Sequence, residues 1–141
     1  MYVDQTKTPQ QRNFLSQQKQ YYRGQVNFND AGIGTGVAFG ALPQGAFITA
    51  VMAWVTTAFN AATTNVFTLG TTKANANEIS ASGTINPATL GFVNGTAAAG
   101  LGMAVTATGP VTLYVKYAQT GAAATAGALT FLIEYCLNND L

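Results

Sequence analysis

Residues 45–59 read GAFITAVMAWVTTAF, and this uncharged stretch decides the fold. It holds 15 residues, three of them threonine, whereas a helix that spans a bilayer needs about 20 mostly apolar residues. Its β-branched and aromatic residues favour a strand over a helix. The stretch therefore predicts a long strand within a protein and no contact with a membrane.

A regular strand here would have two apolar faces. One face would carry Ala46, Ile48, Ala50, Met52 and Trp54, and the other Phe47, Thr49, Val51, Ala53, Val55, Thr57 and Phe59. Such a strand lies between two layers or turns its second face toward another subunit. We predict an interface at Phe47, Val51, Val55 and Phe59, while a core role for the same four residues stays open.

The clearest alternation of apolar and polar residues lies near the C-terminus. In residues 111–117 the inward side chains would be Val111, Leu113, Val115 and Tyr117, and in residues 128–139 they would be Leu129, Phe131, Ile133, Tyr135 and Leu137. Thr130, Glu134 and Cys136 would point outward. Together with glycine, proline and asparagine turns, the chain predicts about seven to nine short strands. We therefore expect an all-β jelly-roll or β-sandwich body over residues 26–141.

Residues 1–25 differ from this body because they are polar and rich in glutamine. The run Thr8-Pro9-Gln10-Gln11 fits a capping box with proline at the first helical position, which predicts a short helix over residues 9–22. Its few apolar side chains cannot fold alone. We predict an extended, partly helical N-terminal arm that becomes ordered against the body or a neighbour. Its candidate contact residues are Phe14, Leu15, Tyr21, Tyr22 and Arg23.

Charge is scarce throughout the chain. Charged residues make up 8% of the sequence, against about 25% in an average soluble domain. Residues 1–28 hold four cations and one carboxylate, and the rest holds two cations and four carboxylates. Four cations spread over the arm are too sparse to predict binding of nucleic acid. A surface with so little charge favours cover by copies of the chain or by another protein.

No set of residues suited to chemistry is visible. The absence of histidine from the sequence excludes Ser-His-Asp and Cys-His nucleophiles. Cys136 is predicted to pack on a strand, and Asn75–Glu78 lacks the acidic density of a calcium loop. The glycine run at residues 32–40 departs from a dinucleotide fingerprint because Val37 replaces the third glycine. We predict no catalytic, cofactor-binding or metal-binding residues, and no enzyme.

Three segments carry a resemblance to a known group. They are LPQGAFITAVMAWVTTAFN at residues 42–60, VFTLGTT at residues 66–72 and GALTFLIEYCLN at residues 127–138. This pattern of turns and strands resembles the small jelly-roll domains of tailed-bacteriophage head decoration (cement) proteins. The matching positions are Leu42, Pro43, Gly45, Ala46, Ile48, Ala58, Phe59, Asn60, Gly70, Thr71, Glu134 and Tyr135.

The resemblance implies a non-enzymatic structural protein of the virion. Such a protein would be made in the host cytoplasm and would sit on the capsid surface as a homotrimer. Its partner would be the major capsid protein, whose shell it would bind and stabilise. The arm of residues 1–25 departs from the simplest version of these domains. The alternative is a receptor- or glycan-binding module of a phage tail or fibre that uses the loops of residues 71–102.

Overall fold

The computed structural model describes residues 19–94 and 109–137. Within these two ranges the chain forms seven strands and no helix, so no described helix is long and apolar enough to cross a membrane. The strands are β1 (Gln20–Asn27), β2 (Val37–Leu42), β3 (Ala46–Thr57), β4 (Thr64–Gly70), β5 (Gly91–Asn94), β6 (Val111–Thr120) and β7 (Ala128–Leu137).

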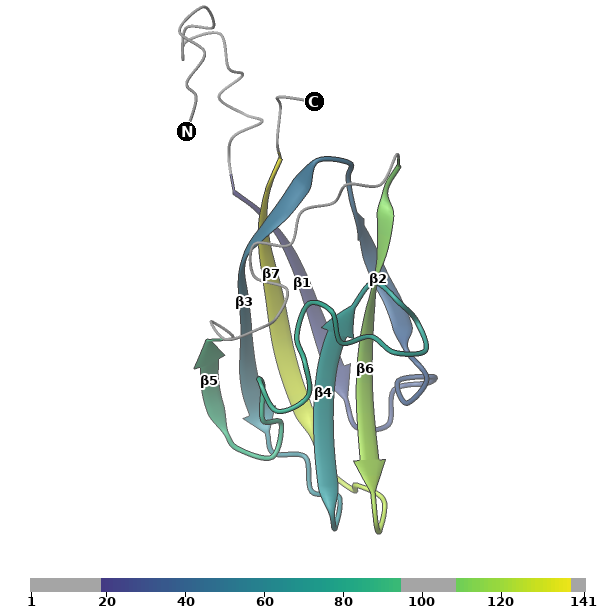
Figure 1. Cartoon of the computed structure of the whole chain (residues 1–141). Coiled ribbons are helices and arrows are strands. Elements are labelled where there is room, and N and C mark those ends of the chain that lie inside the picture. Colours follow the sequence, from purple (N-terminus) through teal and green to yellow (C-terminus); the bar gives the residue numbers. More distant parts are fainter. Residues whose placement is uncertain (1–18, 95–108, 138–141) are drawn as a thin grey trace, which may run out of the picture.

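The strands form two antiparallel sheets that pack face to face (Figure 1). One sheet has the order β1-β7-β3-β5 and the other β2-β6-β4. Consecutive described strands alternate between the two sheets, which fits a jelly roll. A single bridge between Leu69 and Ser80 adds a further pairing to β4. The predicted all-β sandwich is thus confirmed for the described residues.

The core lies between the sheets and is closed by aromatic rings. Phe131 of β7 is 1% exposed. Its ring centre lies 4.8 Å from that of Phe39 on β2 and 5.8 Å from that of Phe67 on β4. Tyr22 of β1 stacks on Tyr135 at 5.4 Å. The ring of Phe131 contacts rings from two strands of the opposite sheet, so burial of apolar area between the sheets holds the sandwich together.

The alternation predicted for the last two strands is confirmed. Leu113, Val115 and Tyr117 of β6 are buried, and Val111 is half-buried. On β7 the buried set includes Leu129, Phe131, Ile133 and Tyr135, while Leu137 packs against the core at its margin.

The faces predicted for residues 45–59 are wrong beyond Thr49. The pairing of β3 with β7 shifts its register between Ile48 and Ala50, so Thr49 is an extra residue in a β-bulge. The extra residue turns the side chains that follow it to the other face, up to a second register shift between Val55 and Thr57. The inner face of β3 therefore carries Ala46, Ile48, Val51, Ala53 and Val55, and the outer face carries Phe47, Met52 and Trp54.

The first strand begins earlier than the predicted boundary at residue 25. Residues 20–25 belong to β1 and pair with residues 130–135 of β7. The predicted helix over residues 9–22 is therefore replaced by strand at residues 20–22, while residues 9–18 lie outside the described residues. All eight residues of β1 pair with β7, and Tyr22 stacks on Tyr135. These tertiary contacts outweigh the local preference of residues 20–22 for a helix.

Candidate protein interface

The outer face of the four-stranded sheet carries a group of exposed apolar side chains. Trp54 of β3 is 58% exposed, and Phe92 of β5 is 60% exposed. The two residues are direct cross-strand partners. Met52 and Leu132, also partners across β3 and β7, lie beside them and line a shallow groove with Thr130. We call Met52, Trp54, Phe92 and Leu132 the outer patch.

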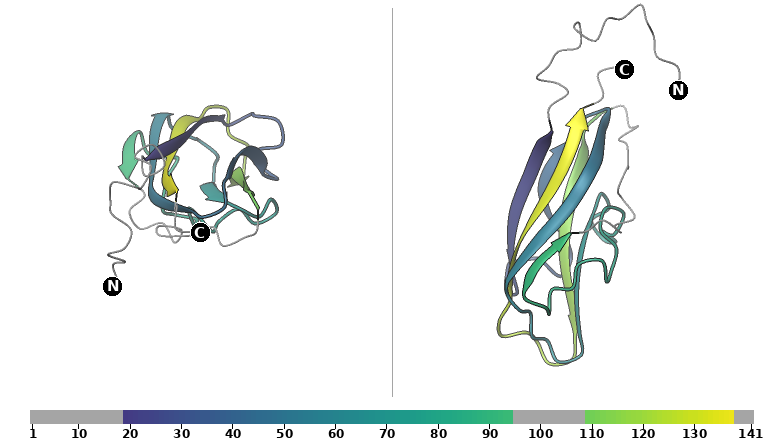
Figure 2. Two further views of the ribbon diagram at one scale, coloured as in Figure 1. Left: turned by 90° about the horizontal axis from the view of Figure 1, so that it is seen from above. Right: turned by 90° about the vertical axis from the view of Figure 1, so that its left-hand side faces the viewer.

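The strand order explains how this patch is framed. The sheet faces the viewer in the right-hand view of Figure 2, where β5 lies at one edge and β1 at the other. The pairing aligns Arg23 with Leu132, and Gln25 with Thr130. Polar side chains of β1 therefore form one margin of the patch, and Asn94 of β5 lies opposite Met52 at the other margin. Exposed apolar side chains framed by polar ones are typical of protein interfaces.

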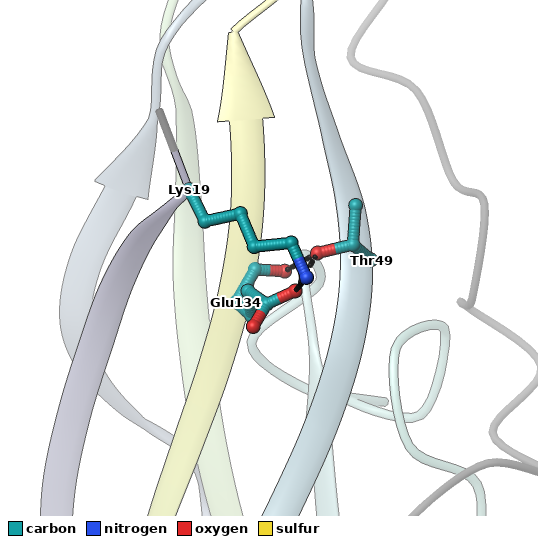
Figure 3. A network of polar contacts seen from close by, with 3 residues as sticks. All are labelled: Lys19, Thr49 and Glu134. Carbon is teal, nitrogen blue, oxygen red and sulfur yellow. Dashed lines mark hydrogen bonds and ion pairs between the residues drawn. The ribbon is translucent and has the colours of Figure 1, made fainter. Parts of the chain in front are cut away.

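A polar contact crosses the same sheet near the start of β1. The Lys19 ammonium lies 2.8 Å from Oε1 of Glu134, and the Thr49 hydroxyl donates a 2.6 Å hydrogen bond to the same oxygen (Figure 3). Glu134 is only 8% exposed, although it lies on the outer side of β7. Thr49 belongs to β3, Glu134 belongs to β7, and Lys19 directly precedes β1. The contact therefore ties the start of β1 to the other two strands.

This contact changes the titration of both charged groups. The Lys19 ammonium, and then the Thr49 hydroxyl, hold the pKa of Glu134 below its usual value, and Glu134 raises the pKa of Lys19. The folded state therefore keeps Glu134 ionised at a lower pH than the unfolded chain does. The resulting stabilisation is present above the unfolded pKa and is lost as the pH falls through the folded pKa.

Glu134→Gln is expected to weaken the loss of stability in acid. Below about pH 5, unfolding of the variant should take up fewer protons than unfolding of the unchanged chain, by up to about one proton. Urea unfolding at a series of pH values measures this number. Lys19→Gln should shift the pH dependence in the same direction, since it removes the main partner of Glu134. An unchanged pH dependence in Glu134→Gln would contradict the assignment.

A second carboxylate anchors the loop after β4. Burial raises the pKa of Glu78, but hydrogen bonds from Thr72 and from backbone amides outweigh it, so that the pKa falls below its usual value. The amides of Thr71 and Asn77 donate to Oε2 at 3.0 and 3.2 Å. Glu78 thus has a structural role in ordering the loop. In residues 19–94 and 109–137, no three cysteine or acidic side chains gather as a metal site would require.

The predicted contact residues have different positions in the structure. Tyr21 is 54% exposed, Phe47 is 37% exposed and Arg23 is exposed. Tyr22 instead packs against the core, and Val51, Val55 and Phe59 are at most 2% exposed. The core role that the sequence left open therefore applies to these last three residues. Phe14 and Leu15 lie outside the described residues.

The outer patch was not predicted from the sequence. A regular strand has Trp54 and Met52 on the same face as Ile48, and nothing in the sequence marks Thr49 as a bulge. Phe92 lies within residues 71–102, for which the sequence predicts loops. The available signal was the polar Thr49 in the middle of an apolar strand, but a threonine is common in strands and does not indicate a bulge.

The described residues define a class of protein: a two-sheet β-sandwich with jelly-roll strand order and an exposed apolar face on one sheet. A chain in the solved structure of the "Cyanophage Pam1 capsid asymmetric unit" has the same fold, with a TM-score of 0.65 and 21% sequence identity. The match covers 98% of this chain and 98% of that one. No protein-family model matches this chain, and no curated protein matches it.

Proposed function

We propose that this chain is a non-enzymatic structural protein of the phage virion. More specifically, we propose that it is a decoration protein. As a homotrimer on the capsid surface, it would bind the shell that the major capsid protein forms. The observation that carries the proposal is the likeness over 98% of both chains to a chain of a cyanophage capsid asymmetric unit. The protein would be made in the host cytoplasm and then join the virion.

The mechanism would be burial of apolar surface between protein chains. Apolar area removed from water contributes about 25 cal/mol per Å². The exposed aromatic side chains on the outer face and the low charge of the chain both suit this mechanism. Tyr21, Arg23 and Phe47 remain proposed contacts because they are exposed, and Phe14 and Leu15 remain proposed contacts of the arm.

Binding to empty shells tests this role. Shells assembled from the major capsid protein of the same genome are mixed with the purified full chain and pelleted. We expect the full chain to pellet with the shells until their sites are filled. Deleting residues 1–18 should reduce binding at least about tenfold, a difference of about 1.4 kcal/mol. The deletion stops before Lys19 because β1 begins at Gln20.

Variants within the arm provide the matched comparison. A double change of Phe14 and Leu15 to serine should weaken shell binding, while the same change at Gln10 and Gln11 should not. If the full chain fails to bind the shells, the proposed role is wrong. Binding of the full chain to a glycan array, without binding to shells, would favour the receptor-binding alternative.

A further inference from the structure

The outer patch is a large apolar surface for so small a sheet. Trp54 and Phe92 expose more than half of their side chains and lie opposite one another on β3 and β5. Leu90, just before β5, is 64% exposed. An aromatic side chain can bury about 150–250 Å², so the two rings alone offer roughly 250 Å² to a partner.

The charge of this face fits contact between identical surfaces. The four strands of the sheet contain just two charged residues, Arg23 and Glu134. Glu134 is already paired with Lys19, so Arg23 is the remaining charge, and it lies at the β1 margin. The whole chain has a net charge of +1. Copies of this face therefore meet with little repulsion, and a net charge near zero favours association.

The area of the patch suits the centre of an interface. A stable protein–protein interface buries about 800 Å² on each partner, with an apolar centre and a polar rim. The patch supplies about a third of that area, and Gln25, Thr130 and Asn94 supply polar groups at its margins. No described strand pairs with the outer edge of β5, so a partner on the patch can extend over that edge.

We infer that the outer patch is the surface through which copies of this chain bind one another. The inference rests on the self-association in the proposed function and assigns it to Met52, Trp54, Phe92 and Leu132. Around a threefold axis, three such patches would meet at the axis, so the assignment is compatible with a trimer. In each copy Trp54 and Phe92 would lose their contact with water.

Trp54 is the one tryptophan of the sequence, so its fluorescence reports directly on the patch. The full chain is diluted over a wide concentration range, and mass by analytical ultracentrifugation is measured beside the emission maximum. We expect the emission to shift to the blue as the mass rises above that of a monomer. Phe92→Ser should raise the dissociation constant at least about tenfold, with the blue shift moving to the same higher concentrations.

A second variant and a control keep the test specific. Thr130→Lys places a like charge beside the patch in every copy and should also weaken association. Tyr114→Ser is the control, because Tyr114 lies at an outward position of β6, in the three-stranded sheet on the other side of the sandwich. Circular dichroism checks that each variant is folded.

Assembly that leaves the Trp54 emission unchanged, or that persists in a folded Phe92→Ser variant, would overturn the inference but leave self-association intact. A chain that is monomeric at every concentration would overturn the inference and the proposed trimer. Shell binding, measured separately, would still decide the proposed role in the virion.

Discussion

Replacing Phe131 by alanine is expected to lower the free energy of unfolding by about 3–5 kcal/mol. Phe131 is 1% exposed and contacts Phe39 and Phe67 of the opposite sheet. Its ring also covers Gly24, where an added Cβ would clash with Phe131 Cζ. Truncation would leave a cavity between the sheets, and a domain of this size has only about 5–15 kcal/mol of stability.

The same substitution at Phe92 is the matched control. Phe92 is 60% exposed on the outer face, so Phe92→Ala should cost less than about 1 kcal/mol at concentrations where the chain is monomeric. Urea unfolding of both variants measures the difference. Equal losses at the two positions would contradict the assignment of Phe131 to the core and Phe92 to the surface.

Gly127→Ala is expected to destabilise the fold by about 2–4 kcal/mol. Gly127 precedes β7 and has a φ of 150°, which side chains rarely adopt. A Cβ at this position would also lie 2.5 Å from Cγ of Phe59, a ring that is 2% exposed. Backbone strain and overpacking would therefore add, because the ring that must give way is buried.

Two other glycines separate these contributions. Gly83 has a φ of 86°, but within residues 19–94 and 109–137 nothing lies within 4 Å of an added Cβ, so Gly83→Ala should show the backbone cost alone, about 1–2 kcal/mol. Gly109 has no positive φ, and no described residue lies within 4 Å of an added Cβ, so Gly109→Ala should be nearly neutral. Thermal or urea unfolding should show the largest loss of stability for Gly127→Ala, a smaller loss for Gly83→Ala and the smallest for Gly109→Ala. A Gly127→Ala variant as stable as Gly83→Ala would rule out the clash with Phe59.

The two-sheet fold was largely predictable because the strands near the C-terminus alternate cleanly. Along β6 and β7 the inward positions are apolar and the outward ones mostly polar, so the inner face follows from the period of two alone. Glycine and proline also mark turns elsewhere in the chain, as between β2 and β3, where the carbonyl of Pro43 accepts a hydrogen bond from the amide of Ala46. Such local signals need no knowledge of tertiary contacts.

The features that were not predicted depend on contacts between distant residues. The bulge at Thr49 is stabilised by a hydrogen bond from its hydroxyl to Glu134, 85 positions later in the chain. Likewise, β1 is a strand because it pairs with β7, more than 100 positions away. A single sequence does not reveal such partners, so local preference alone suggested a helix that reaches residue 22.

The candidate interface was missed for the same reason. The bulge reverses the faces of β3, which exposes Trp54 and buries Val51 and Val55. The candidate contacts on this strand were therefore on the wrong face, apart from Phe47. Once the bulge is known, alternation predicts Met52 and Trp54 on the outer face beside Leu132.

A cryo-EM reconstruction of shells carrying the full chain tests the central claim most directly. That claim is our proposal that the exposed apolar side chains of the β1-β7-β3-β5 sheet are covered by protein in the assembled virion. We predict density for this chain on the shell, with Trp54 and Phe92 packed against another polypeptide. Density in which this sheet face is open to solvent, or shells without the chain, would contradict the claim.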